Sequence, residues 1–102
     1  MIRRYILAAE AARDLVSIWR YNKKYAGVAV ADRVEAVIRQ KILFLAGTPD
    51  GGHWRKDLTD EVVKFFPVYS YLIVYRPKSS PLEVVAFLHG RRDLEQLLRL
   101  RI

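Results

Sequence analysis

The sequence predicts an α+β domain whose elements follow in the order β-αα-βββ-α, with an antiparallel sheet packed against a helical hairpin. Two observations predict this class. In the first half of the chain, apolar residues recur at intervals of three and four, which is typical of amphipathic helices. In the second half the interval shifts toward two, in segments rich in the Val, Ile, Phe and Tyr that strands favour. At a length of 102 residues, a single domain over residues 1–102 is expected.

The first half is predicted to form a strand and a helical hairpin. Residues 2–7 are rich in Ile and Tyr, which favours an opening strand. Helical spacing begins at about Ala8 and stops at Gly27, because glycine takes the left-handed conformation of a helix end without a Cβ clash. A second helix is expected over residues 28–46. Its apolar stripe, which we expect to pack on the sheet, comprises Val30, Val34, Val37, Ile38, Ile42 and Leu45.

The second half is predicted to form three strands and a short C-terminal helix. Residues 61–68 and 69–76 are dense in strand-forming side chains. Pro67 cannot donate a ladder hydrogen bond, so it should mark a bulge, an edge position or the bend between two strands. Residues 83–88 are apolar enough for a central strand, and residues 91–102 show the leucine spacing of a helix.

The chain is strongly basic. Eighteen Lys and Arg against eleven Asp and Glu give a formal net charge of +7, which favours polyanionic or acidic partners. There is no cysteine, which excludes disulfides, thiolate metal sites and cysteine nucleophiles. No apolar run reaches the length of a membrane span, and residues 1–7 do not form a signal peptide. We therefore expect a cytoplasmic protein without membrane contact.

The usual catalytic and metal-binding patterns are missing. The two histidines, His53 and His89, lie far apart in the sequence, and the acidic residues near His53 do not match a metal-ligand spacing. The Gly51-Gly52 pair lacks the lysine and hydroxyl residue of a phosphate loop. We expect neither a metal nor a cofactor.

Three groups of basic or aromatic residues leave a functional and a structural interpretation open. The Trp54-Arg55-Lys56 segment could stack on a base and pair with phosphate, or cap the edge of the core. Residues Tyr69, Tyr71 and Tyr75 alternate at spacing two, which predicts one face of one strand. Such a face could bind RNA but more often packs a helix or a partner.

The densest charged group is residues 89–93, at a strand-to-helix junction. There, Arg91 and Arg92 follow His89 and precede Asp93. Backbone N–H groups at a helix start add to the positive field, which favours an anion. The alternative is that Asp93 stabilises the helix start while the two arginines are solvated.

Several segments, in this order and spacing, resemble those of one toxin family. The segments are Ala8–Leu15 with Ile18–Tyr21, Leu45–Pro49, Arg55–Leu58, Phe66–Arg76 and His89–Leu94. They are similar to the ParE toxins, within the RelE/ParE superfamily of toxin–antitoxin systems, over nearly the whole chain. The resemblance implies a RelE/ParE-like fold, a ParD-like antitoxin, and trapping of DNA gyrase on cleaved DNA. RelE-type relatives instead cleave mRNA in the ribosome, and one fold with two targets requires an argument from the site.

The RelE-type catalytic pattern implies lysine and arginine on the middle strands and a tyrosine in the last segment. The matching positions here are the apolar Val63, Phe65 and Leu72, and residues 94–102 contain no tyrosine. Apolar side chains neither move a proton nor hold a phosphate dianion, so we expect inhibition by binding and not catalysis. A register shift of one residue would bring Lys64 to the same face and favour the alternative, a ribosome-dependent mRNA interferase.

Two surfaces follow from these considerations. The target-binding residues are predicted to be His89, Arg91 and Arg92, with Trp54, Arg55 and Arg76 as secondary candidates. The antitoxin-binding residues are predicted to be Leu15, Trp19, Tyr21, Tyr69, Tyr71 and Tyr75. The partners expected are a ParD-like antitoxin, with two toxins on an antitoxin dimer, and DNA gyrase, while operator DNA is bound only through the antitoxin. A nonspecific DNA-binding module is a third interpretation, which a steep salt dependence of duplex binding would indicate.

Overall fold

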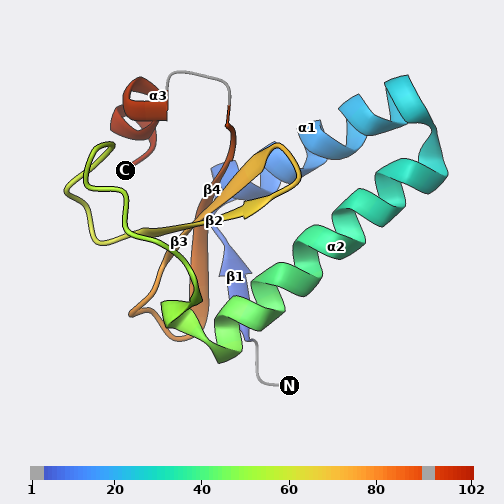
Figure 1. Ribbon diagram of the computed structural model, residues 1–102. Helices are drawn as coiled ribbons and strands as arrows, with labels where there is room; N and C mark the ends of the chain where they lie inside the picture. Colours follow the sequence, from blue (N-terminus) through green and yellow to red (C-terminus); the bar gives the residue numbers. More distant parts are fainter. Residues whose placement is uncertain (1–3, 91–93) are drawn as a thin grey trace.

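A four-stranded sheet with the strand order β1-β4-β3-β2 lies at the centre of the fold, with helices on both of its faces (Figure 1). The computed structural model describes residues 4–90 and 94–102. The predicted element order is confirmed. The elements are β1 (Tyr5–Leu7), α1 (Ala9–Ala26), α2 (Val28–Gly47), the short 3-10 helix η1 (Pro49–Gly51), β2 (Lys64–Val68), β3 (Tyr71–Arg76), β4 (Leu82–His89) and α3 (Leu94–Arg101).

The sheet is mixed rather than purely antiparallel. The β2–β3 and β3–β4 pairs are antiparallel, as expected, but β1 pairs in parallel with β4. A parallel pair needs a long crossover connection, and here the helical hairpin, β2 and β3 all lie between the two strands in the sequence. The pairing of β1 ends at Leu7 opposite Val84, so among the described residues the rest of β4 has no strand neighbour on that side.

Gly27 separates the two helices, as predicted. Its φ of 93° lies in the region that favours glycine, and its N–H donates to the carbonyl of Lys23 at 3.0 Å. The first and last residues of both helices lie within one residue of the predicted boundaries. The hairpin of α1 and α2 that results extends away from the sheet at its Gly27 end (Figure 1).

The predicted stripe of α2 packs into the main core. Val34, Ile38, Ile42 and Leu45 are buried, and Val30 and Val37 pack against them from partly buried positions. The same cluster contains residues of α1 and of the sheet. The α1–α2 hairpin therefore covers one face of the sheet, and the prediction of the stripe is confirmed.

A second core lies on the opposite face of the sheet, under α3. Its central residues include Phe65, Leu88 and Leu98, the last from α3 itself. The register of β3 and β4 shifts between Val74 and Tyr75, and Val85 is the extra residue at that bulge. As a consequence, both Val85 and its neighbour Ala86 contribute to this second core.

The strand predictions need two corrections. Pro67 does lie in an edge strand, β2, as expected. Tyr69, however, is in the turn between β2 and β3 with a φ of 54°, so it does not share a strand face with Tyr71 and Tyr75. β2 begins at Lys64 and not at residue 61, because residues 59–63 form a loop in which the Glu61 N–H donates to the Thr59 hydroxyl.

Candidate functional site

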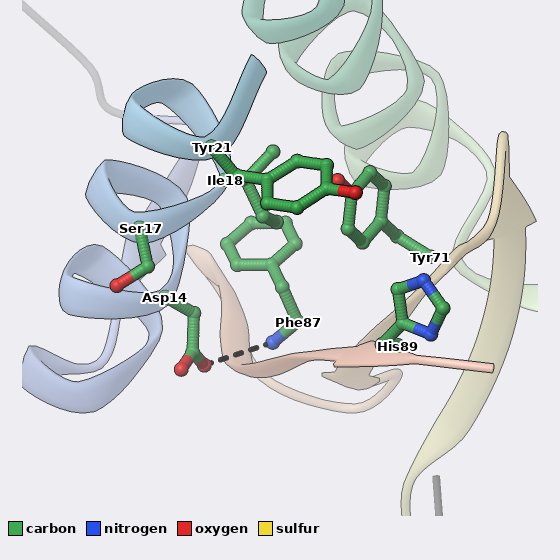
Figure 2. Close-up of a pocket in the computed structure, with 7 residues that line it drawn as sticks. All are labelled: Asp14, Ser17, Ile18, Tyr21, Tyr71, Phe87 and His89. Atoms are coloured by element: carbon green, nitrogen blue, oxygen red, sulfur yellow. Dashed lines mark hydrogen bonds between the residues drawn. The ribbon is translucent and has the colours of Figure 1, made fainter. Parts of the chain in front are cut away.

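A pocket of about 430 Å³ lies between α1 and the end of the sheet formed by β3 and β4. Figure 2 shows the rings of Tyr21, Tyr71 and Phe87 gathered at the pocket, with His89 from the end of β4 beside them. The structure thus brings together His89, predicted to bind the target, and Tyr21 and Tyr71, predicted to bind the antitoxin. The lining residues are Asp14, Ser17, Ile18, Tyr21, Tyr71, Phe87 and His89.

The aromatic side chains of the pocket differ in how firmly they are held. The Tyr71 and His89 rings meet edge to face at 5.7 Å, and Asn22 Nδ2 donates to the Tyr71 hydroxyl at 3.4 Å. Tyr21 is 60% exposed and stacks obliquely on Tyr25, 4.8 Å between ring centroids. The pocket therefore has a fixed wall on the sheet and an open, aromatic rim on α1.

Asp14 connects three elements at the edge of this pocket. Its Oδ2 accepts the backbone N–H of Phe87 at 3.1 Å, on the stretch of β4 that β1 does not reach. Arg101 of α3 donates to both carboxylate oxygens, at 2.6 and 3.3 Å, and also forms an ion pair with Glu10. One carboxylate thus ties the C-terminal helix to α1 and β4.

Asp14 and Arg101 are not among the site residues predicted from the sequence. They lie 87 residues apart, and each has an ordinary place in its own helix. A charged residue on an amphipathic helix usually faces solvent, so the pattern carries no signal for this pair. The two side chains come into contact only because α3 packs beside α1 in the tertiary structure.

The secondary target-binding candidates lie away from the pocket, on other elements. Trp54 is 46% exposed in the loop before β2, with Lys56 Nζ and Lys64 Nζ at 5.3 and 4.9 Å from its ring centroid. Arg55 is paired with Asp57 through two hydrogen bonds, and this pairing lowers the pKa of the Asp57 carboxyl. The predicted target surface is therefore not one continuous patch.

The remaining secondary candidate, Arg76, is also engaged in an ion pair. Its Nε donates to Glu83 Oε1 of the neighbouring strand at 3.0 Å. The two residues face each other in the register of β3 and β4. This cross-strand pair accounts for Arg76 structurally.

Tyr75 and Lys64 hold the turn that follows α2. The Tyr75 hydroxyl accepts the Gly52 N–H at 2.9 Å and donates to the Pro49 carbonyl at 2.6 Å. Burial raises the pKa of this hydroxyl, which keeps its proton in place for the second bond. Lys64, its cross-strand neighbour, donates to the Asp50 carbonyl at 3.3 Å. Both side chains have a structural use.

Of the predicted antitoxin contacts, Tyr75 is corrected, and Leu15 has only a small exposed fraction. Tyr75 is completely buried and cannot present its ring to a partner. Leu15 is 4% exposed and belongs to the main core, where α1 packs on the sheet. Alternation and helical spacing indicate which residues share a face, but not whether a covering layer hides that face.

A match to a protein-family model decides which family this chain belongs to. The model of the ParE toxin of the parDE type II toxin–antitoxin system matches residues 5–94. The chain belongs to the ParE toxin family. A search of the curated proteins finds no match.

The fold of this ParE family member is also that of a solved toxin–antitoxin system. A chain of the chromosomal ParDE system from P. aeruginosa superimposes with a TM-score of 0.72 at 16% sequence identity. The match covers 86% of this chain and 96% of the other. At this identity the likeness concerns the fold alone.

A second pocket of the ParE family member lies on the other side of α1. It is lined mostly by aliphatic residues and by Trp19, whose Nε1 donates to Asp32 of α2 at 2.9 Å. Trp19 is thus fixed across the hairpin and forms part of an apolar groove between the two helices. The lining residues are Leu7, Ala12, Leu15, Val16, Trp19, Glu35 and Arg39.

Some of the predictions fall outside what the structure describes. Arg91 and Arg92, two of the three main target-binding candidates, lie outside the described residues 4–90 and 94–102. Within those residues, no three acidic or histidine side chains gather as metal ligands would. Among the described helices, none combines the length and apolar character that crossing a membrane requires.

Proposed function

We propose that this ParE family toxin inhibits DNA gyrase by binding it, that it does so without catalysis, and that a ParD-like antitoxin neutralises it in the cytoplasm. Membership of the family supports the toxin–antitoxin part of the proposal. The apolar side chains on the side of the sheet that faces α3 support the absence of catalysis. The target surface proposed is the pocket around His89, because its aromatic rim is exposed and its polar groups converge there.

The observation that carries the proposal is the apolar packing beneath α3. Val63 and Phe65 are buried in the second core, and Leu72 packs against it. These are the positions that match the proton-handling and phosphate-holding residues of a RelE-type ribonuclease. Side chains packed under a helix cannot reach an RNA phosphate, and aliphatic or phenyl groups have no proton to transfer.

The apolar groove between α1 and α2 supports an antitoxin partner. A groove lined by Val16 and Trp19 suits the apolar side of an amphipathic segment. The net charge of +7 favours an acidic one, because complementary charge speeds association and selects the partner. We propose a complex of two toxins with an antitoxin dimer, in which the antitoxin alone contacts operator DNA.

An ATP-dependent supercoiling assay with purified gyrase and toxin tests the target. We expect inhibition of supercoiling and accumulation of cleaved DNA at micromolar toxin. His89→Ala, which removes an imidazole from the pocket, is expected to weaken inhibition at least tenfold, whereas His53→Ala serves as the matched control. Normal supercoiling would remove gyrase as the target, and codon-positioned mRNA cleavage in a translating extract would establish the interferase alternative.

Lys64→Met provides a separate test of non-catalytic action. The Lys64 ammonium is buried, and its acidic partner Asp50, 3.6 Å away, is almost fully exposed. An unbranched apolar side chain of similar length should therefore change the free energy of unfolding by less than about 1 kcal/mol. We expect full growth inhibition by this variant on induction. A loss of toxicity with unchanged thermal stability would indicate a chemical role for Lys64.

A further inference from the structure

A row of basic residues follows the exposed side of α1 next to the pocket. Arg13, Arg20 and Lys24 are exposed, and their spacing of seven and four residues places them on one side of the helix. At 1.5 Å per residue the row is about 16 Å long. No acidic residue occurs between Leu15 and Ala31. Around Arg20 and Lys24 this side of α1 therefore has a positive potential, whereas Arg13 has Glu10 and Asp14 close to it in the sequence.

Exposed aromatic rings lie beside this row. Tyr21 and Tyr25 are 60% and 67% exposed and touch each other, and Lys24 Nζ lies 5.4 Å from the Tyr25 ring centroid. The Tyr21 ring continues into the pocket, where Tyr71 and His89 form the far wall (Figure 2). Rings and cations thus lie side by side on one surface, from near the Gly27 end of the hairpin to the pocket.

The carboxylate in the pocket is partly neutralised. Asp14 is held by two hydrogen bonds from the Arg101 guanidinium, which also pairs with Glu10. The other pocket differs in character, since it lies on the opposite side of α1 and is mainly aliphatic. The two sides of α1 therefore suit different ligands: an apolar peptide on one, and an aromatic, anionic molecule on the other.

We propose that this surface binds single-stranded nucleic acid. One unpaired base enters the pocket against Tyr21, a neighbouring base stacks on Tyr25, and Arg20 and Lys24 pair with the phosphates between them. Stacking requires a free base face, which a single strand offers and a duplex does not. The inference goes beyond gyrase inhibition, because it concerns a direct contact of this chain with a strand and needs no topoisomerase.

Fluorescence anisotropy of the purified full chain with a labelled oligothymidylate tests the proposal. The oligonucleotide should have about 12 nucleotides, a length within the usual range of site sizes for single-strand-binding proteins. We expect binding at about 50 mM salt that weakens steeply as salt is raised, and weaker binding of the matching duplex. Tyr21→Ala should reduce affinity roughly 5- to 150-fold, the range measured for loss of one stacked base. Tyr21→Phe should retain it, since the ring face is kept.

Charge variants separate a specific site from general attraction. Arg20→Ala should lower the slope of log affinity against log salt by about 0.7, the value for one phosphate contact on a single strand. Arg33→Ala removes an equal charge from α2 and should leave the affinity nearly unchanged. Equal losses in both variants, no binding at low salt, or a preference for the duplex would each overturn the proposal. Equally effective competition by polyglutamate would assign the surface to an acidic protein instead.

Discussion

Asp14→Ala is expected to lower the free energy of unfolding by about 2–3 kcal/mol, a large share of the stability of a domain this size. The change leaves the Phe87 N–H without its acceptor, and it leaves the Arg101 guanidinium with Glu10 as its remaining partner. The side chains of Asp14 and Arg101 are only 23% and 15% exposed, so water replaces the lost bonds poorly. Thermal unfolding followed by circular dichroism should show a Tm lower by roughly 10–20 °C.

Two further variants show whether this loss comes from the shared carboxylate. Glu10→Ala also removes a carboxylate next to Arg101, but Glu10 is 56% exposed, and we expect a cost below about 1 kcal/mol. Arg101→Ala should cost nearly as much as Asp14→Ala, and the double variant should cost much less than the sum. Additive effects would show that the two residues stabilise the fold independently.

Gly52→Ala is expected to cost about 2–4 kcal/mol through steric conflict and a disturbed hydrogen bond. A Cβ at this position would lie 2.5 Å from the Tyr75 hydroxyl and 3.0 Å from the Phe65 carbonyl. Tyr75 is completely buried, and its hydroxyl is held by hydrogen bonds to Gly52 and Pro49. Urea unfolding measures the loss. Gly47→Ala is the matched control, since its Cβ would meet nothing within 4 Å, and it should be neutral or stabilising.

A double-mutant cycle with Tyr75→Phe identifies the cause of that loss. Alone, Tyr75→Phe should cost about 1–3 kcal/mol, because the buried Gly52 N–H loses its acceptor. In the Gly52→Ala background the phenylalanine also removes the 2.5 Å contact with the hydroxyl, although the contact with Cε1 at 2.8 Å remains. We expect a coupling of about 1 kcal/mol or more. Simple additivity would mean that the clash is relieved elsewhere in the loop.

The helical hairpin could be predicted almost completely from the sequence. The stripe from Val30 to Leu45 has the period of a helix. Position 27, which has a positive φ, is occupied by glycine, the residue that adopts this conformation most easily. Both signals are local, because they depend on neighbours within four residues. Pro67 was predicted at a bulge, an edge position or a bend for a similar reason, since a missing N–H disfavours a central strand whatever the context.

The strand faces could be predicted only in part. Alternation implied one face for Tyr69, Tyr71 and Tyr75, but it does not show where a strand begins or which layer covers it. Tyr69 falls in a turn, while Tyr75 is enclosed by the loop after α2. Similarly, nothing in the spacing of β4 announces the bulge at Val85, which directs two successive residues to the same core.

The sequence by itself determined the fold class, the order of the elements and the family, because each follows from periodicity, turn residues and motif order along the chain. It also determined that Val63, Phe65 and Leu72 are apolar, the positions at which the resemblance to RelE-type toxins implies reactive groups. Only the tertiary structure decided that His89 and Tyr21 line one pocket and that Asp14 meets Arg101. Contacts between residues so far apart depend on how α1, α3 and the sheet pack together, and no local pattern encodes that packing.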